Sequence, residues 1–408
     1  MMENRYDKYK DSGIAWIGEI PEHWEVCSIK QIMKNKSIKG FPNETVLSLY
    51  RDLGVIPKDS REDNHNVTSE DTSNYKFVEE GDFVINKMKA WQGSMAISDY
   101  KGIVSPAYYV CKVINSKVDK KYIHYLLRNE SYKVEYMRLS TGMRIGQWDL
   151  NINDFLQINT IIPSVLEQQS IATYLDQKCG EIDELITLQE EMITKLQSYK
   201  QSVITEAVTK GLDKNVPLKD SGIEWIGEIP EHWNVVKIKY LAKIKSGDSI
   251  SSNEIIQEGI YEVYGGNGLM GYCNEKNVDG FNIIIGRVGA LCGNVRLISE
   301  SKYITDNALI LNCFNNSLYP YMYIMLKAAN LNNLNTSNAQ PLITGSKVLN
   351  VSLPIPPLHE QQMIATYLDQ RCSEIDELIS IKQQKIEKLK EYKKSLIFEC
   401  VTGKRKVS

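Results

Sequence analysis

Two stretches of the chain combine hydrogen-bonding and cationic side chains with glycines and aromatic residues. The first holds the candidate binding residues Asn86, Lys87, Lys89, Trp91 and Gln92, followed later in the chain by Arg144 and Gln147. The second holds Gly266, Asn267, Arg287, Asn294 and Asn307. Lys and Arg contact phosphates, and Arg, Lys, Asn and Gln also hydrogen-bond to base edges. The two stretches therefore predict contact surfaces for a nucleic acid, although each residue is equally typical of a solvated loop.

The overall charge argues against such surfaces, and the local charge argues for them. The 408 residues carry a formal net charge of −3, whereas phosphate binding favours positive potential. Residues 81–148 hold eleven Lys and Arg against five Asp and Glu, a local charge of +6. Residues 236–350 hold ten against eight, a local charge of +2. This distribution permits a basic face in both stretches without proving one.

Known motifs of catalysis and cofactor binding are not found in the sequence. Residues 266–271 match G-x-G-x-x-G, but the residues after them have loop composition, so a glycine-rich turn is expected in place of a dinucleotide site. The eight cysteines form no C-x-x-C pair, so neither a zinc site nor a disulfide framework is predicted. His23 and His232 are expected to pack structurally, and Glu167 and Glu360 to lie in the first turn of a helix. We therefore expect catalysis on the target to come from another chain.

The architecture is set by two repeated blocks in the order A-B-A-B. Residues 10–26 return at 219–235 with two changes in seventeen positions, and residues 167–186 return at 360–379 with three changes in twenty. The segments between the paired blocks show little similarity. Nearly identical frames therefore hold divergent inserts, and two similar globular units are predicted in place of a solenoid of short repeats.

Each B block predicts a long helix that begins after a proline and ends near Gly211 or Gly403. Apolar residues spaced three and four apart predict a helix-pairing seam in each. The predicted seam residues are Ile182, Leu185, Met192, Leu196 and Tyr199 in the first helix and Ile375, Leu378, Leu389, Tyr392 and Leu396 in the second. Gln189, Lys382 and Lys385 interrupt these stripes, either as simple breaks or as determinants of register. The helices can pair with each other or with another chain.

The inserts predict a mixed α/β fold. Residues 81–85, 102–105 and 281–285 have the composition of strands, and residues 120–137 and 319–329 that of helices. No run of about 18 uncharged apolar residues occurs, and the first ten residues do not resemble a secretory signal. A cytoplasmic protein is expected.

At these residues the chain resembles the specificity subunits of type I restriction-modification enzymes, over nearly its whole length. The resemblance rests on the Trp-Ile-Gly-Glu-Ile-Pro-Glu-His-Trp segments ending at Trp24 and Trp233, on residues 86–94 and 264–268, and on the Pro-x-x-x-Glu-Gln-Gln-x-Ile-Ala-x-Tyr-Leu segments at 163–175 and 356–368. Each motif is a moderate signal, and their A-B-A-B order makes the combination strong.

The resemblance implies two pseudo-symmetric α/β target recognition domains joined by two long antiparallel coiled-coil helices. The implied boundaries are 1–163 and 212–356 for the recognition domains and 164–211 and 357–408 for the spacer helices. It further implies a non-catalytic subunit that recognises a bipartite, asymmetric site in double-stranded DNA. Two methyltransferase subunits, and restriction subunits where present, would carry out adenine methylation and cleavage. S-adenosylmethionine, ATP and Mg would then be bound by those partners, and no metal by this chain.

A second interpretation remains open at the level of sequence. The inserts could bind protein instead of DNA, in a two-module scaffold that dimerises through its long helices, and the acidic overall charge favours this slightly. Phosphate contacts impose a steep salt dependence on binding, whereas protein contacts need not. Salt-dependent DNA affinity therefore separates the two interpretations.

Overall fold

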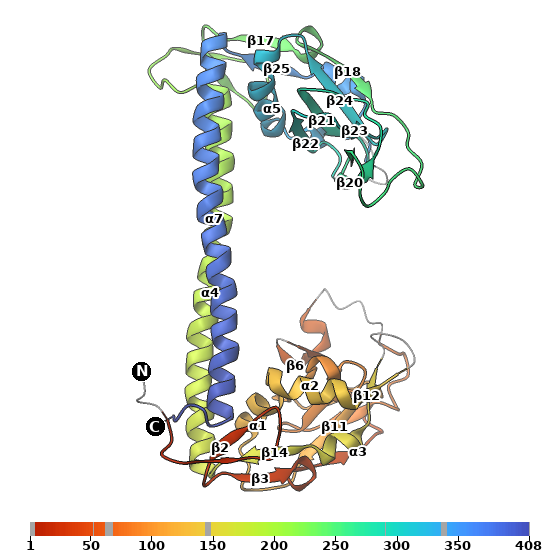
Figure 1. Ribbon diagram of the computed structural model, residues 1–408, viewed down its shortest axis with the longest axis vertical. Helices are drawn as coiled ribbons and strands as arrows, with labels where there is room; N and C mark the ends of the chain where they lie inside the picture. The colour runs from red at the N-terminus through yellow and green to blue at the C-terminus, as the bar shows by residue number, and fades with distance from the viewer. Residues whose placement is uncertain are drawn as a thin grey trace. The chain divides into compact units, whose positions relative to one another are not determined.

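A computed structural model describes residues 5–51, 53–61, 68–142, 148–289, 291–335 and 341–407 of the chain. The chain divides into two compact units, and each is described by itself (Figure 1). Unit 1 comprises residues 1–189 and 384–408, and unit 2 comprises residues 190–383. The two long helices, α4 (Val165–Lys210) and α7 (Leu358–Val401), each contribute one part to both units.

Unit 1 is built on a four-stranded antiparallel sheet in the order β4-β11-β8-β9, with smaller two-stranded ladders around it. Its strands are β1 (Tyr9–Asp11), β2 (Glu19–Pro21), β3 (Glu25–Ser28), β4 (Met33–Lys36), β5 (Leu47–Tyr50), β6 (Gly54–Pro57), β7 (Lys76–Val78), β8 (Phe83–Asn86), β9 (Met95–Ile97), β10 (Gly102–Val104), β11 (Tyr108–Val113), β12 (Ser140–Thr141), β13 (Asp149–Leu150) and β14 (Asn159–Ile162). Its own helices are α1 (Lys120–Leu127), α2 (Glu130–Leu139) and α3 (Ile152–Gln157).

Unit 2 repeats this plan with a four-stranded antiparallel sheet in the order β18-β24-β21-β22. Its strands are β15 (Leu218–Asp220), β16 (Glu228–Pro230), β17 (Asn234–Lys237), β18 (Ala242–Ser246), β19 (Tyr261–Gly265), β20 (Gly268–Cys273), β21 (Asn282–Gly286), β22 (Val295–Ile298), β23 (Tyr303–Ile304), β24 (Ala308–Cys313) and β25 (Ser352–Ile355). Its own helices are α5 (Tyr319–Ala328) and α6 (Gly345–Leu349). The mixed α/β fold and the pair of antiparallel long helices agree with the sequence-based prediction.

One predicted helix is in fact two. The sequence predicts a single helix over residues 120–137, whereas the chain forms α1 and α2 with Arg128 and Asn129 between them. Asn129 has extended backbone angles, and its side-chain oxygen accepts a hydrogen bond from the Ser131 amide, so it caps the second helix. Asn competes for backbone donors in this way and favours caps over helix interiors. The predicted strands lie within a few residues of β8, β10 and β21.

Each unit has its own core in which the repeated A and B blocks pack together. These packed blocks are called the frame of the unit. In unit 1 the start of α4 and the end of α7 lie in one hydrophobic core with Trp24, whose side chain is fully buried. In unit 2 the end of α4 and the start of α7 share a core with the buried Trp233. Each unit therefore contains the beginning of one long helix beside the end of the other, which makes the two helices antiparallel.

The buried stripe of the long helices differs from the predicted seam at alternate positions. Four predicted seam residues are exposed, with relative exposures of 43% for Leu185, 50% for Tyr199, 47% for Leu378 and 52% for Tyr392. The other predicted members, Ile182, Met192, Leu196, Ile375, Leu389 and Leu396, are buried or partly buried. The less exposed neighbours of the four are Ile186, Lys200, Ile379 and Lys393, each one residue further along. Counted from Ile182 or Ile375, the less exposed residues are therefore spaced four and then three apart, whereas the predicted seam residues are spaced three and then four apart.

The polar residues of the stripe do not all behave alike. Gln189 is buried and Lys382 is partly buried, with its Nζ 3.3 Å from the Met192 sulfur, whereas Lys385 is exposed. Ion pairs flank the stripe within each unit, from Lys393 to Asp183 at 2.6 Å and from Lys200 to Asp376 at 2.6 Å. No helix in the described part of the chain has the length and apolar character needed to cross a membrane.

Candidate nucleic-acid interface

The loop between β8 and β9 carries most of the predicted binding residues of unit 1. The Asn86 amide donates a hydrogen bond to the Ser94 carbonyl at 3.0 Å, which closes the loop. Gly93 has a φ of +79°, a left-handed conformation that favours glycine. The loop is thus a closed turn at the end of a central strand, and its shape is fixed by backbone bonds.

Lys87 is the point at which three separate segments of unit 1 meet. Its amide donates to the Ala107 carbonyl at 3.2 Å, and its carbonyl accepts from the Leu150 amide at 3.1 Å. Its side chain is partly exposed, with Nζ 3.4 Å from Asp149 Oδ2. The backbone of this lysine is therefore held on both sides, while its charge stays accessible to a ligand.

Arg287 occupies the same place in unit 2. The Gly286 amide donates to the Asn294 carbonyl at 2.9 Å, the Arg287 amide donates to Asn307 at 3.0 Å, and the Arg287 carbonyl accepts from Ile343 at 2.9 Å. Gly293 has a φ of +86°, as Gly93 has +79°. Because the same four features recur, Lys87 and Arg287 are structurally equivalent residues.

This equivalence reveals a third internal match that the sequence analysis missed. The matched positions 87 and 287, 94 and 294, and 107 and 307 differ by 200 in residue number, whereas Leu150 and Ile343 differ by 193. Residues 86–94 and 286–294 are identical only at the alanine and the glycine of an Ala-x-x-Gly segment. That short segment, with a basic residue three positions before its alanine, is the only sequence signal of the shared loop, and it is too weak to stand out alone.

In unit 2 the structure brings the predicted residues together. A Cβ atom on Gly266 would lie 2.7 Å from the Asn307 carbonyl oxygen and 3.5 Å from the Arg287 amide nitrogen, so only glycine fits there. Arg296, which the sequence analysis did not select, donates to the carbonyls of Gly266 at 3.3 Å and Asn267 at 3.0 Å. All five predicted residues of this insert, Gly266, Asn267, Arg287, Asn294 and Asn307, thus surround one end of the central sheet.

Arg287 has unsatisfied hydrogen-bonding capacity at this place. Its Nη1 donates to Ser246 Oγ at 3.3 Å, while its buried Nε has no partner among the described residues. The buried Thr305 hydroxyl is also without a partner there. A buried polar group without a partner is costly and is normally satisfied by a ligand or by water. The Arg287 Nε can therefore donate a hydrogen bond to a bound molecule or to water, and the Thr305 hydroxyl can donate or accept one.

In unit 1 the predicted residues fall into two groups. Asn86, Lys87, Lys89, Trp91 and Gln92 share the β8–β9 loop, where the Trp91 ring lies edge-on to Trp148 with centroids 5.1 Å apart. Gln92 accepts a hydrogen bond from Arg51 Nη2 at 2.6 Å, and Lys89 is exposed. Arg144 and Gln147 lie outside the described residues. Arg51, like Arg296, was not selected from the sequence, because each lies far along the chain from the loop that it contacts.

Among the described residues, the repeated His-Trp pairs bind the long helices and not the predicted binding loops. His23 Nε2 lies 2.9 Å from Glu167 Oε1, and Trp24 Nε1 donates to the same oxygen at 3.3 Å. In unit 2, His232 lies 2.8 Å from Glu360, and Trp233 Nε1 donates to Glu360 at 2.9 Å. Each glutamate thereby ties an A block to the first turn of a long helix, so these residues stabilise the frame.

Glu167 is held in its charged form by these bonds. Burial by itself would raise the pKa of Glu167, but hydrogen bonds from His23, Ser164 and Trp24 outweigh burial and lower the pKa below its usual value. Ser164 also accepts from the Glu167 amide, which completes a capping box at the start of α4. A carboxylate with a lowered pKa suits a structural anchor better than a proton-transferring acid.

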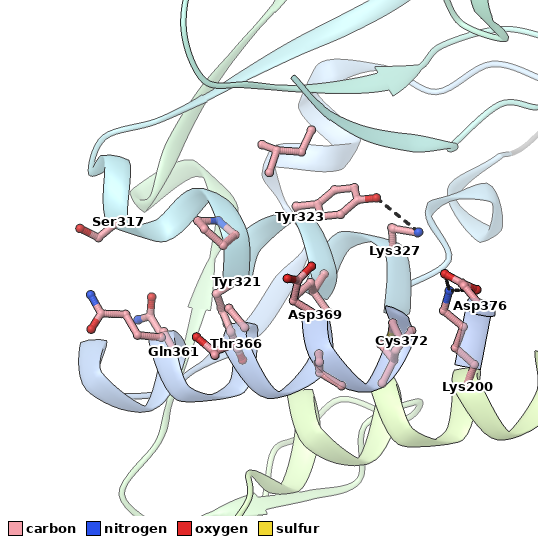
Figure 2. Close-up of a pocket in the computed structure, with 17 residues that line it drawn as sticks. Lys200, Ser317, Tyr321, Tyr323, Lys327, Gln361, Thr366, Asp369, Cys372 and Asp376 are labelled. Atoms are coloured by element: carbon pink, nitrogen blue, oxygen red, sulfur yellow. Dashed lines mark hydrogen bonds and ion pairs between the residues drawn. The ribbon is translucent and has the colours of Figure 1, made fainter. Parts of the chain in front are cut away.

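Unit 2 also contains an open groove between α5 and the long helices, away from the predicted residues. It has a volume of about 540 Å³ and is lined by apolar side chains together with charged ones, among them Lys327 and Asp369. Figure 2 shows Tyr323 and Lys327 of α5 on one side of the groove, with Asp369 and Cys372 of α7 on the other. Burial raises the pKa of the Cys372 thiol, which keeps it protonated and unreactive at neutral pH. The groove is therefore suited to hold part of another molecule.

Neither unit offers a metal centre in the part of the chain that the structure describes. No group of three or more His, Cys, Asp or Glu side chains there could hold a metal ion. The arrangement around Lys87 and Arg287 combines cations, amides and backbone groups with the carboxylate of Asp149 beside Lys87, and its cations and amides bind anions and hydrogen-bonding edges. Its chemistry is that of recognition.

Comparison with known proteins identifies the relatives of this chain. A family model described as "Type I restriction modification DNA specificity domain" matches residues 21–197 and 230–391. The type I restriction enzyme MjaVIII specificity subunit of Methanocaldococcus jannaschii is 25% identical over 95% of this chain and 94% of its own length. A solved chain described as "Structural basis underlying complex assembly and conformational transition of the type I R-M system" covers 94% of this chain and 98% of itself, with a TM-score of 0.74 at 16% identity. The HsdS subunit from Thermoanaerobacter tengcongensis covers the same shares with a TM-score of 0.52 at 16% identity. The two structures show that the fold is shared.

Proposed function

The chain belongs to the type I restriction modification DNA specificity family, and we propose that each of its units reads one half of a split site in double-stranded DNA. The family consists of specificity subunits, which are the non-catalytic subunits of these enzymes. In this proposal the chain selects the site, and methyltransferase and restriction subunits modify adenines and cleave the DNA. S-adenosylmethionine, ATP and Mg belong to those partners, and the complex acts in the cytoplasm.

The observation that carries the proposal is the pair of equivalent loops with different side chains. Lys87 and Arg287 extend from the same backbone position, held by the same bonds. The guanidinium of Arg donates two parallel hydrogen bonds to guanine, whereas the ammonium of Lys acts as a point charge on phosphate or base acceptors. Lys87 and Arg287 are called the reading residues. Because equivalent loops carry different reading residues, the two half-sites are expected to differ in sequence, which makes the target asymmetric.

The proposed boundaries follow the helices. Recognition domains over residues 1–163 and 212–356 would be separated by spacer segments 164–211 and 357–408, within which α4 and α7 lie. The groove of unit 2 is the surface that we assign to a methyltransferase subunit, because an open groove beside a long helix, lined by both apolar and charged side chains, can hold a segment of a partner.

The proposal is tested by mapping methylated adenines in host DNA with and without this chain. We expect a split, asymmetric motif to lose its methylation when the chain is removed. Exchange of residues 236–350 for those of a relative with a known site should then alter one half of the motif and leave the other half unchanged. Methylation that is indifferent to the chain would reject the proposal and favour the protein-binding scaffold.

A further inference from the structure

Each unit carries a two-stranded hairpin beside the loop that holds Lys87 (residues 86–94) or Arg287 (residues 286–294), which is called its basic loop below. In unit 1 it is formed by β5 and β6, and in unit 2 by β19 and β20. The two hairpins are equivalent because each makes a parallel β-bridge to the matching position of its unit. Val46 pairs with Ile103 in unit 1, and Val263 pairs with Tyr303 in unit 2. The hairpins differ in sequence and in the length of their turns.

Arginine side chains fasten the tip of each hairpin. In unit 1, Arg51 at the tip donates to Gln92 of the basic loop at 2.6 Å, and Arg128 donates to the Arg51 carbonyl. In unit 2, Arg296 donates to the tip carbonyls of Gly266 and Asn267. Both tips are thus held in place directly beside the loops that carry Lys87 and Arg287.

Large apolar side chains are exposed at both tips. Leu53 is 54% exposed in unit 1, and Leu269 and Met270 are 50% and 52% exposed in unit 2. In unit 2 the pairing of the hairpin shifts between Val263 and Tyr264, and two successive residues of β20 are exposed where a regular strand would alternate. Such bulges are common near functional sites, where they redirect a side chain.

We propose that Leu53 and the Leu269–Met270 pair are apolar wedges that insert between base steps of bound DNA, next to the bases contacted by the basic loops. The inference rests on the proposed function. Proteins that deform DNA use Leu, Met and similar residues in this way, and the cost of unstacking is offset by the additional contacts that bent DNA makes. A wedge must be held in place to act, and the arginine bonds hold Arg51 near Leu53 in unit 1 and Gly266 and Asn267 near Leu269 in unit 2.

The charges around the tips favour DNA as the occupant. Arg51 and Arg128 lie at the tip of the first hairpin, and Arg287 and Arg296 lie at the tip of the second. Guanidinium groups keep their positive charge while they hydrogen-bond to the tips, and positive charge attracts phosphate oxygens. An apolar tip surrounded by guanidinium groups therefore complements a stacked base step between phosphates better than it complements an apolar protein surface.

The test uses the full chain assembled with its methyltransferase subunits and a duplex that carries the mapped motif. Two variants replace the wedges, Leu53→Ser and the double substitution Leu269→Ser with Met270→Ser. 2-Aminopurine, whose fluorescence rises when it is unstacked, is placed at steps flanking each half-site and away from the methylated adenines. We expect each variant to bind about tenfold more weakly and to lose the fluorescence increase at its own half-site only.

Matched controls are available in both units. Ile114 and Phe314 are exposed apolar residues at equivalent places, directly after β11 and β24 and at the opposite ends of these strands from Ala107 and Asn307. Ile114→Ser and Phe314→Ser should leave affinity and fluorescence unchanged. These controls separate insertion from a general effect of removing exposed apolar surface.

The possible outcomes distinguish the wedge from the proposed function. If the wild-type complex binds the duplex tightly and both wedge variants match it in affinity and fluorescence, the wedge is refuted while DNA recognition stands. Absence of a fluorescence increase at every flanking step of the wild-type complex would refute it as well. If the wild-type complex does not discriminate the motif from unrelated duplex, both the wedge and the proposed function fail.

Discussion

The two units share the same frame but differ in how an insert helix packs on a long helix. The contrast is between α1 on α4 in unit 1 and α5 on α7 in unit 2. In unit 1, Asp176 of α4 accepts hydrogen bonds from Lys121 at 2.6 Å and from Tyr125 at 2.8 Å, both on α1. The matching aspartate of unit 2 is Asp369 of α7. Pro320 and Ile324 of α5 stand where Lys121 and Tyr125 stand in unit 1, and neither side chain can donate a hydrogen bond.

The alignment of α1 with α5 rests on a buried tyrosine in each. Tyr122 donates to the Val401 carbonyl at 3.0 Å and Tyr321 donates to the Pro354 carbonyl at 2.9 Å, with a second, longer contact to Ile161 and Val208 respectively. The groove of unit 2 opens beside Asp369. The repeated aspartate of the long helices, Asp176 or Asp369, thus has a different environment in each unit because a different insert packs on it. Comparison of the units therefore distinguishes effects of the frame from effects of the insert.

Substitutions in the frame should destabilise both units to the same extent, and they should have the largest effect of the changes considered. Trp24→Ala and Trp233→Ala each remove a fully buried indole, so each should lower the free energy of unfolding by about 3–5 kcal/mol, measured by denaturant titration. Trp24→Phe, which keeps most of the volume but loses the bond to Glu167, should cost much less. If the two alanine variants differed strongly in cost, the frames would not be equivalent.

A titratable residue should distinguish the units at low pH. Burial and the charge of Arg128 lower the pKa of His124 to about 3, whereas Tyr323 stands at the matching position of α5. Because the pKa of His124 is lower in the folded than in the unfolded chain, the folded state binds fewer protons between these two values. The contribution of neutral His124 to the free energy of unfolding should be fully present above pH about 6.5. It should decline as the pH falls, by about 2 kcal/mol at pH about 5.

His124→Gln tests this pH dependence, since an amide oxygen can still accept from the Ile97 amide as His124 Nδ1 does. Unfolding of the wild type and of this variant should be compared at neutral and at mildly acidic pH. The variant should lose less stability on acidification. An identical loss in both proteins would assign the pH dependence to other groups.

The reading residues should affect DNA binding separately in the two units. Lys87→Met and Arg287→Met should each weaken binding to the mapped site by about tenfold and reduce the salt slope by about one ion. Each should relax specificity only in its own half of the motif, which methylation of half-site mutants would reveal. Lys390→Met, an equal change of charge on an exposed residue of α7, serves as the control. If both variants altered the same half-site, the assignment of one half to each unit would be wrong.

The smallest effect is expected at the differing aspartates. Asp176→Asn weakens an exposed pair with Lys121, so it should reduce stability by about 0–1 kcal/mol. Asp369→Asn should change stability less, but it alters the groove, and co-purification of the methyltransferase subunit reports on that surface. Loss of the partner with Asp176→Asn and its retention with Asp369→Asn would contradict the assignment of the groove.

The sequence by itself determined the repeated frame and the long helices. The A and B blocks recur almost unchanged, and their buried Trp and Ile residues and partly buried Glu residues make the same contacts in each unit, so repetition in sequence becomes repetition in structure. The start of α4 was predictable to within about two residues, because proline and a capping box act locally. Lys87 and Arg287 were selected by residue type alone, without knowledge that they are equivalent.

Only the tertiary structure decided what depends on a partner segment. The seam was ambiguous because Leu185 and Leu378 are followed directly by Ile186 and Ile379, and only the packed partner decides which of the two is buried. The equivalence of the basic loops lies in backbone hydrogen bonds, which constrain side chains so weakly that the sequences diverged. Arg51 and the hairpin tips reach these loops across long separations in sequence, and Arg296 reaches the tip at Gly266 and Asn267 in the same way, so local patterns of sequence could not reveal these contacts.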